Sequence, residues 1–147
     1  MTMKEYKMTG QEHLIAVVEP TLDGEAPVEF AKEAFDRGGR ATVFLLIGKE
    51  TVNNIAAFAD AEDLTFPDGR EIYLERIAEL YSEIFNGKGS LTIVADGPEA
   101  NRIVFDRVAR EAATSVVVPQ RLANRRNWKA SVSKANVPVV LTPPKAA

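Results

Sequence analysis

The stretch His13-Leu14-Ile15-Ala16-Val17-Val18 decides the fold, because it is a short, unbroken apolar run rich in β-branched residues. Similar runs follow at 41–47, 91–95, 115–118 and 139–141. A strand that is buried on both faces has this pattern, since helices cover both sides of a parallel sheet. Each run is therefore predicted to be a buried strand.

Segments with the apolar spacing of helices separate these runs. Pro27 suits the first turn of a helix, where its missing N–H is not needed, and Gly38-Gly39 would end that helix. Asp68 and Glu71 have the spacing of a capping box and would begin the next long helix. Further helical segments are predicted at about 51–59, 98–113 and 131–135.

The order of these elements predicts a fold class. Strands that alternate with helices indicate a single-domain, Rossmann-like α/β fold, with a mostly parallel sheet and helices on both faces. We expect the domain to span residues 12–147, after a flexible N-terminus over residues 1–11. In such sheets ligands bind beyond the carboxyl ends of the strands, so the loops at 19–25, 48–53, 96–99 and 119–130 are the candidates.

The composition excludes several kinds of chemistry. The chain has no cysteine, so disulfides, thiolate metal sites and cysteine nucleophiles are excluded. Its only histidine, His13, stands at the amino end of a strand, where a core or solvent position is favoured over catalysis. No apolar run approaches the roughly 18 residues of a membrane span, and Met1–Glu12 lacks the apolar core of a secretory signal. We therefore expect a cytoplasmic protein that is not an enzyme, holds no metal and binds no membrane.

Charge is distributed unevenly along the chain. The net charge is −3, but no acidic residue follows Glu111, and six basic residues give that last segment +6. The first 111 residues therefore carry −9. Such asymmetry indicates either an anion-binding face or a solvated basic loop, and both interpretations remain open at this point.

The basic loop Pro119–Lys129 follows the predicted fourth strand, where nucleotide-binding folds hold phosphate. Phosphate cradles use glycine because backbone amides must approach the anion closely. This loop contains no glycine, and Pro119 has no amide donor. Trp128 within the loop is either a stacking platform for nucleic acid or an anchor to the core. The anchor is favoured, and we expect no nucleic acid to bind.

Side chains at the same edge offer another way to hold a nucleotide. Arginine guanidinium groups bind phosphate through charge-assisted hydrogen bonds, serine hydroxyls donate to it, and a carboxylate accepts from a base or ribose. The residues that would play these parts, if a nucleotide binds, are Glu19, Arg125, Arg126, Ser131 and Ser133.

Over His13–Pro143 the chain resembles the universal stress protein family in the order and length of its elements. The last third is the most specific part. Ala130-Ser131-Val132-Ser133 resembles the Gly-Ser-Val-Ser-like phrase that opens the family's last helix, and Pro138-Val139-Val140-Leu141 resembles its last strand. Gly97-Pro98-Glu99-Ala100 is similar to the start of the family's third helix.

The resemblance implies a five-stranded parallel sheet of order 3-2-1-4-5. It also implies a homodimer that pairs through the last strand, here Val139, Val140 and Leu141. Members of the family that bind ATP carry an Asp after the first strand and a Gly-x-x-Gly, nine residues, Gly-Ser/Thr signature after the fourth.

This chain departs from the ATP-binding signature at each point. Glu19 stands where the Asp is expected, and Pro119 and Leu122 fall nearest the paired glycines. Ala130 replaces the glycine before Ser131, and the loop is about two residues short. The resemblance therefore implies that ATP binding is lost or weak and that no cofactor is held.

The function that follows is a non-catalytic, universal stress protein-like domain. It would act in a stress response by dimerising and by binding an unknown protein partner. One alternative is a nucleotide-binding stress protein that holds phosphates with Arg125, Arg126, Ser131 and Ser133. A second alternative is a flavodoxin-like or Rossmann-like enzyme that has converged on the same element order.

Overall fold

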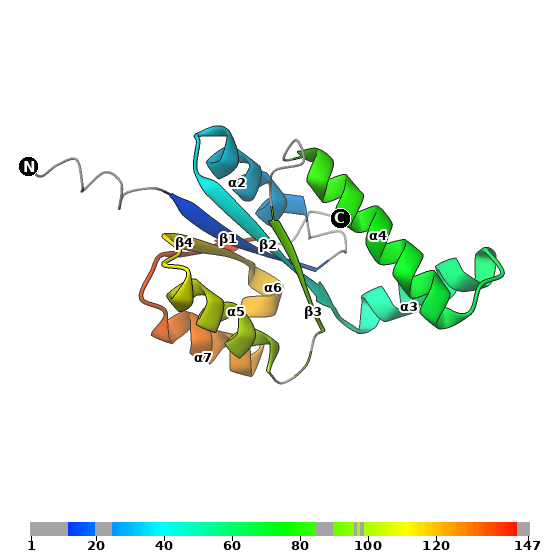
Figure 1. The fold of residues 1–147 in the computed structure, drawn as a ribbon. Helices are drawn as coiled ribbons and strands as arrows, with labels where there is room; N and C mark the ends of the chain where they lie inside the picture. The colour runs from blue at the N-terminus through cyan, green and yellow to red at the C-terminus, as the bar shows by residue number, and fades with distance from the viewer. Residues whose placement is uncertain (1–11, 20–24, 85–89, 96, 98, 144–147) are drawn as a thin grey trace, which may run out of the picture.

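The strands of the chain form one parallel sheet. The structure, a computed structural model, describes residues 12–19, 25–84, 90–95, 97 and 99–143. Its strands are β1 (His13–Val18), β2 (Arg40–Ile47), β3 (Ser90–Ala95), β4 (Ser115–Pro119) and β5 (Val139–Thr142). They lie in the order β3-β2-β1-β4-β5, and each pair is parallel (Figure 1). The predicted Rossmann-like α/β fold with a parallel sheet is confirmed, whereas the N-terminus predicted to be flexible, 1–11, lies outside the described residues.

Helices cover both faces of the sheet. They are α2 (Glu25–Asp36), α3 (Lys49–Ala61), α4 (Phe66–Ile84), α5 (Ala100–Arg110), α6 (Gln120–Ala123) and α7 (Arg126–Lys134). α2 and α4 pack on one face, and α5, α6 and α7 pack on the other. Alternate residues of β1 enter the two cores, with Ile15 in one and Ala16 in the other, which explains the unbroken apolar run.

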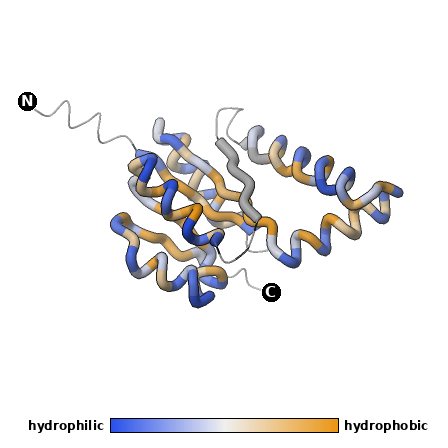
Figure 2. Tube along the Cα trace, turned by 60° about the horizontal axis from the view of Figure 1, so that its bottom comes forward, coloured by the Kyte–Doolittle hydropathy of each residue, from blue (hydrophilic) through white to orange (hydrophobic). Residues whose placement is uncertain are grey.

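α3 and α4 pack against each other and extend beyond the sheet as an arm (Figures 1 and 2). They approach closely at Gly69, where an added Cβ would lie 2.5 Å from the Cβ of Ala59. The ring of Phe58 packs on Tyr73 with 5.8 Å between centroids, and Arg76 lies over the Phe58 ring. In Figure 2 the centre of the sheet is hydrophobic, whereas the arm alternates between hydrophilic and hydrophobic residues.

The start of α4 differs slightly from the prediction. The helix begins at Phe66 rather than at Asp68, because Thr65 provides the cap. The Thr65 hydroxyl accepts a hydrogen bond from the Asp68 backbone N–H at 3.3 Å. Thr65 and Asp68 therefore have the three-residue spacing that the prediction assigned to Asp68 and Glu71.

The predicted start of the last helix, about Ser131, is wrong. α7 begins five residues earlier, at Arg126, and the short helix α6 precedes it. The reason is Trp128, which is 1% exposed and meets the ring of Phe105 edge-on at 6.3 Å. A helix that begins at Arg126 places Trp128 and Val132, four residues apart, on the face that packs against the core. The interpretation of Trp128 as a core anchor is therefore confirmed.

No helix in the described parts of the chain combines the length and the apolar composition that crossing a bilayer requires.

Candidate functional site

A cavity of about 610 Å³ opens beyond the carboxyl ends of β1, β2 and β4. The order of the strands places the switch point between β1 and β4, which is where ligands bind in sheets of this kind. The cavity is lined by Glu19 after β1, by residues at the start of α3 and by Arg121 and Arg125 after β4. Its position therefore agrees with the ligand edge predicted from the sequence.

One ion pair lies in the lining of this cavity. Arg125 Nη2 lies 3.3 Å from Glu19 Oε2, although the two residues are 106 positions apart in the chain. The Glu19 side chain is 14% exposed and that of Arg125 is 45% exposed, so the guanidinium is the more solvent-accessible member of the pair. The guanidinium predicted to meet a phosphate is therefore engaged by a carboxylate.

Backbone N–H groups of the loop after β4 are used in hydrogen bonds within the loop itself. The Asn124 N–H donates to the Gln120 carbonyl at 3.1 Å, and the Arg125 N–H donates to the Leu122 carbonyl at 3.0 Å. A phosphate nest needs such amides pointing at the anion. These two amides instead complete a short helix, and Pro119 before them has no N–H.

Ser131 lies away from the cavity, between α5 and α7. Its hydroxyl accepts a hydrogen bond from Asn101 Nδ2 at 2.7 Å, and the same nitrogen donates to the Asn127 carbonyl at 3.2 Å. Asn127 returns a bond from its Nδ2 to Asn101 Oδ1 at 3.3 Å. Asn101 is 6% exposed, so this network replaces hydration that burial removes. Ser131 therefore joins two helices, and the polar position at Asn101 within an apolar helix face was the signal that sequence reasoning missed.

Arg126 and Ser133 are on the outer face of α7. They line a depression of about 480 Å³ together with Asn124, Lys129 and Ala130. Because α7 begins at Arg126, the phrase Ala130-Ser131-Val132-Ser133 lies inside the helix rather than at its start. The structure thus brings two of the five predicted residues, Glu19 and Arg125, together in the cavity and places the other three elsewhere.

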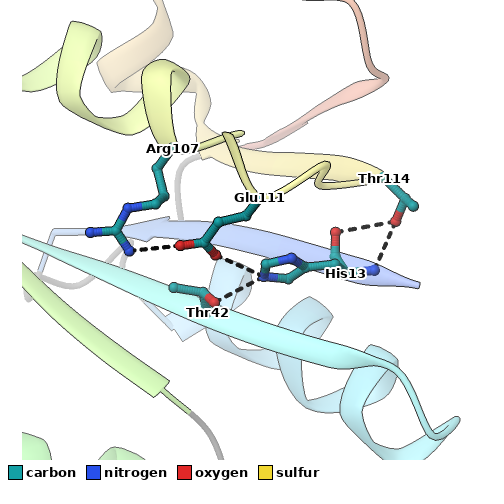
Figure 3. Close-up of polar contacts among 5 residues, drawn as sticks. All are labelled: His13, Thr42, Arg107, Glu111 and Thr114. Atoms are coloured by element: carbon teal, nitrogen blue, oxygen red, sulfur yellow. Dashed lines mark hydrogen bonds and ion pairs between the residues drawn. The ribbon is translucent and has the colours of Figure 1, made fainter. Parts of the chain in front are cut away.

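A second polar cluster surrounds His13 at the amino edge of the sheet (Figure 3). The His13 side chain is buried, and its Nε2 lies 3.0 Å from Thr42 Oγ1 and 3.7 Å from Glu111 Oε1. Glu111 also pairs with Arg107 at 3.0 Å. The Thr114 hydroxyl accepts from the His13 N–H at 3.0 Å and lies 3.1 Å from the His13 carbonyl, to which it donates. The cluster therefore joins β1, β2 and the segment after α5.

The geometry of this cluster does not match a catalytic triad. In a triad one imidazole nitrogen meets the nucleophile and the other meets the carboxylate. Here Thr42 and Glu111 both approach Nε2, and the Thr42 side chain is buried. Burial, and secondly the charge of Arg40, lower the pKa of His13 below its ordinary value of 6.5, against an opposing effect of Glu111. The neutral ring is therefore favoured at pH 7, and of the two positions predicted for His13, core or solvent, the structure shows the core.

Within the described residues no three histidine, aspartate or glutamate side chains gather in a way that would hold a metal ion.

Comparison with solved structures identifies the fold. The sequence matches no family model and no curated protein. The structure is similar to the universal stress protein UspA from Lactobacillus plantarum, with a TM-score of 0.56, 12% identity and coverage of 89% of this chain and 97% of that one. A universal stress protein family member from Burkholderia pseudomallei has a TM-score of 0.55 and 13% identity, with 90% of this chain and 96% of that chain covered. The hypothetical protein MJ0577 has a TM-score of 0.58 and 11% identity, with 92% of this chain and 98% of that chain covered. The chain therefore has the fold of universal stress proteins.

Proposed function

We propose that this protein is a non-catalytic, cytoplasmic universal stress protein that acts in a stress response through dimerisation and a protein partner. Its cavity would bind ATP weakly or not at all. The observation that carries this proposal is the ion pair between Glu19 and Arg125, both of which line the cavity. A nucleotide would have to break that pair and then place its phosphates beside the Glu19 carboxylate.

The volume of the cavity does not itself oppose a nucleotide, because small-molecule sites commonly measure about 300–1,000 Å³. The groups that line the cavity do oppose nucleotide binding. The Asn124 and Arg125 amides are bonded within the loop, so they are not directed at an anion. Side-chain cations without backbone donors hold a phosphate less rigidly than a preorganised nest does.

The edge of the sheet supports the proposed dimer. β5 is the last strand in the order and carries Val139 and Val140, which are half-buried, and Leu141, which is 41% exposed. An edge strand offers backbone donors and acceptors for pairing with another strand. Pairing with β5 of a second copy would use those groups and cover Leu141.

A second candidate function is nucleotide binding through side chains. It is favoured by three basic residues that line the cavity, namely Lys49, Arg121 and Arg125. In this candidate Arg125 leaves Glu19 and binds phosphate. Arg126, Ser131 and Ser133, which the sequence suggested for this role, lie outside the cavity.

Nucleotide analysis tests the main proposal and separates it from the second candidate. The purified protein is denatured, its supernatant is analysed by mass spectrometry, and the protein is then titrated with ATP by calorimetry. We expect no nucleotide and a dissociation constant weaker than about 1 mM. Glu19→Gln should tighten ATP binding by up to about tenfold, because it weakens the Glu19–Arg125 ion pair and removes a charge that repels phosphate.

Arg126→Ala is the matched control, since Arg126 is a neighbouring arginine outside the cavity. Stoichiometric nucleotide, or micromolar ATP binding that Arg125→Ala abolishes and Arg126→Ala leaves intact, would overturn the main proposal in favour of the second candidate. The dimer is tested separately by light scattering at high salt, where Leu141→Lys should convert the dimer to a monomer. A wild-type protein that is monomeric under every condition would contradict it.

A further inference from the structure

The outer face of α4 is exposed and acidic along its length. Asp68, Glu71, Glu75, Glu79 and Glu83 follow one another at spacings of three or four residues, which places them on one side of the helix. None of these carboxylates forms an ion pair in the part of the chain that the structure describes. Like charges at this spacing destabilise a helix. Asp68, in the first turn, interacts favourably with the helix dipole, but the carboxylates further along the stripe do not stabilise α4 through one another.

Apolar surface lies beside the stripe. A groove of about 430 Å³ along α4 is lined by the apolar residues Pro67, Leu74 and Ala78, by the acidic residues Glu71 and Glu75, and by the basic residue Arg70. Leu80, on the same helix, is 55% exposed. The whole arm, from residue 49 to residue 84, holds nine acidic and three basic side chains, a net charge of −6. Its surface thus combines negative charge with apolar contact area.

The outer face of α7 has the opposite charge. Arg126, Lys129 and Lys134 are exposed there, and none of them is in an ion pair among the described residues. Arg126 and Lys129 border the depression of about 480 Å³ described above. No acidic residue follows Glu111, so nothing on this part of the chain neutralises the face.

The two charged faces do not meet within one molecule. α4 packs on one side of the sheet and α7 on the other, as the two separate cores show (Figure 1). We infer that the arm of one copy docks on α7 of a second copy, with the acidic stripe of α4 against Arg126 and Lys129. In a dimer with two-fold symmetry, α4 of each copy would contact α7 of the other copy. The two equivalent contacts would then cover both charged faces of both copies.

This contact is distinct from the proposed pairing of β5, and it holds whether or not the cavity binds a nucleotide. The difference lies in salt dependence. Attraction between exposed charges weakens as the Debye length shortens, from about 10 Å at 0.1 M salt to about 3 Å at 1 M. The arm contact is therefore sensitive to salt, whereas pairing through apolar β5 is not.

Charge reversal in both faces tests the inference by sedimentation velocity. The arm variant is Glu75→Lys with Glu79→Lys, and the α7 variant is Arg126→Glu with Lys129→Glu. Raising salt from about 50 mM to about 500 mM should weaken the wild-type association at least about tenfold. Each variant alone should lose the salt-sensitive association, because two like-charged faces then meet.

An equimolar mixture of the two variants should associate again. In the mixture the basic arm meets the acidic α7 face, and the remaining acidic arm meets the remaining basic face. Glu29→Lys with Glu33→Lys, on the exposed side of α2, makes the same change in net charge as the arm variant and should leave association unchanged. Circular dichroism confirms that each variant is folded.

Three results would overturn the inference. The first is a wild-type protein with no salt-sensitive association at any concentration tested. The second is association that survives reversal of either face, and the third is a mixture that fails to associate. If the wild-type protein does not self-associate but binds polylysine, the acidic arm binds a different basic partner. That result would also contradict the inference that the arm binds a second copy of this chain.

Discussion

The two edges of the sheet use polar side chains in opposite ways. At the amino edge His13 is buried; its Nε2 contacts Thr42 and Glu111, its backbone exchanges hydrogen bonds with Thr114, and its Nδ1 is buried without a hydrogen-bond partner (Figure 3). At the carboxyl edge the partly exposed pair of Glu19 and Arg125 lies in the lining of an open cavity. The amino edge therefore stabilises the fold, while the carboxyl edge keeps charged groups within reach of solvent and of ligands.

The difference extends to what holds the chain at each edge. The carboxyl-edge segment around α6 and α7 is anchored in the apolar core by Trp128. Apolar anchoring leaves Arg125 and its neighbours uncommitted to the core. This arrangement allows the lining of a site to change while the scaffold stays the same, as in folds that carry different functions on one architecture.

The largest expected effect concerns this anchor. Trp128→Ala removes a fully buried side chain and its edge contact with Phe105, so the free energy of unfolding should fall by about 3–5 kcal/mol. Denaturant unfolding measures the change, and Trp128→Phe, which keeps an aromatic ring, should lose much less. A loss below about 1 kcal/mol for the alanine variant would mean that the charged groups, not the anchor, hold this edge.

The second prediction tests the polar cluster at the amino edge. His13→Gln disrupts a buried hydrogen-bonded cluster, and its cost at neutral pH should be about 1–3 kcal/mol. The wild-type protein should also lose stability as pH falls. Because burial, helped by Arg40, lowers the pKa of His13 in the folded state, the unfolded chain takes up a proton first, near pH 6.5.

The difference between the folded and unfolded pKa of His13 decides how the free energy of unfolding changes with pH. Between pH 6.5 and the lower folded pKa the unfolded state binds more protons, so the free energy of unfolding decreases with falling pH. Urea unfolding at several pH values measures the slope, and His13→Gln should flatten it. A slope unchanged by the substitution would show that another group, and not His13, makes the protein sensitive to acid.

The sequence revealed the scaffold better than the site. Strand runs such as Leu14–Val18 are local patterns, and the topology then brings the ends of β1 and β4 together, so Glu19 and Arg125 could be predicted as neighbours. The sequence predicts the wrong place for Ser131, because the motif Ala130-Ser131-Val132-Ser133 indicates a helix start whereas α7 begins at Arg126. The i, i+4 spacing of Trp128 and Val132, both in contact with the core, indicates an earlier start. The partners of Ser131 depend on how α5 and α7 pack, which no local pattern encodes.

The smallest expected effect comes from the carboxyl edge itself. Arg125→Ala removes a partly exposed ion pair, so the free energy of unfolding should change by less than about 1 kcal/mol. Glu19→Gln should change it equally little, and the double variant should differ from the sum of the two by no more than about 0.5 kcal/mol. Denaturant unfolding at low and high salt provides the measurement. If either substitution lowered the free energy of unfolding as much as His13→Gln does, the Glu19–Arg125 pair would be a structural contact like the cluster at the amino edge. The interpretation of the cavity as an open site would then be wrong.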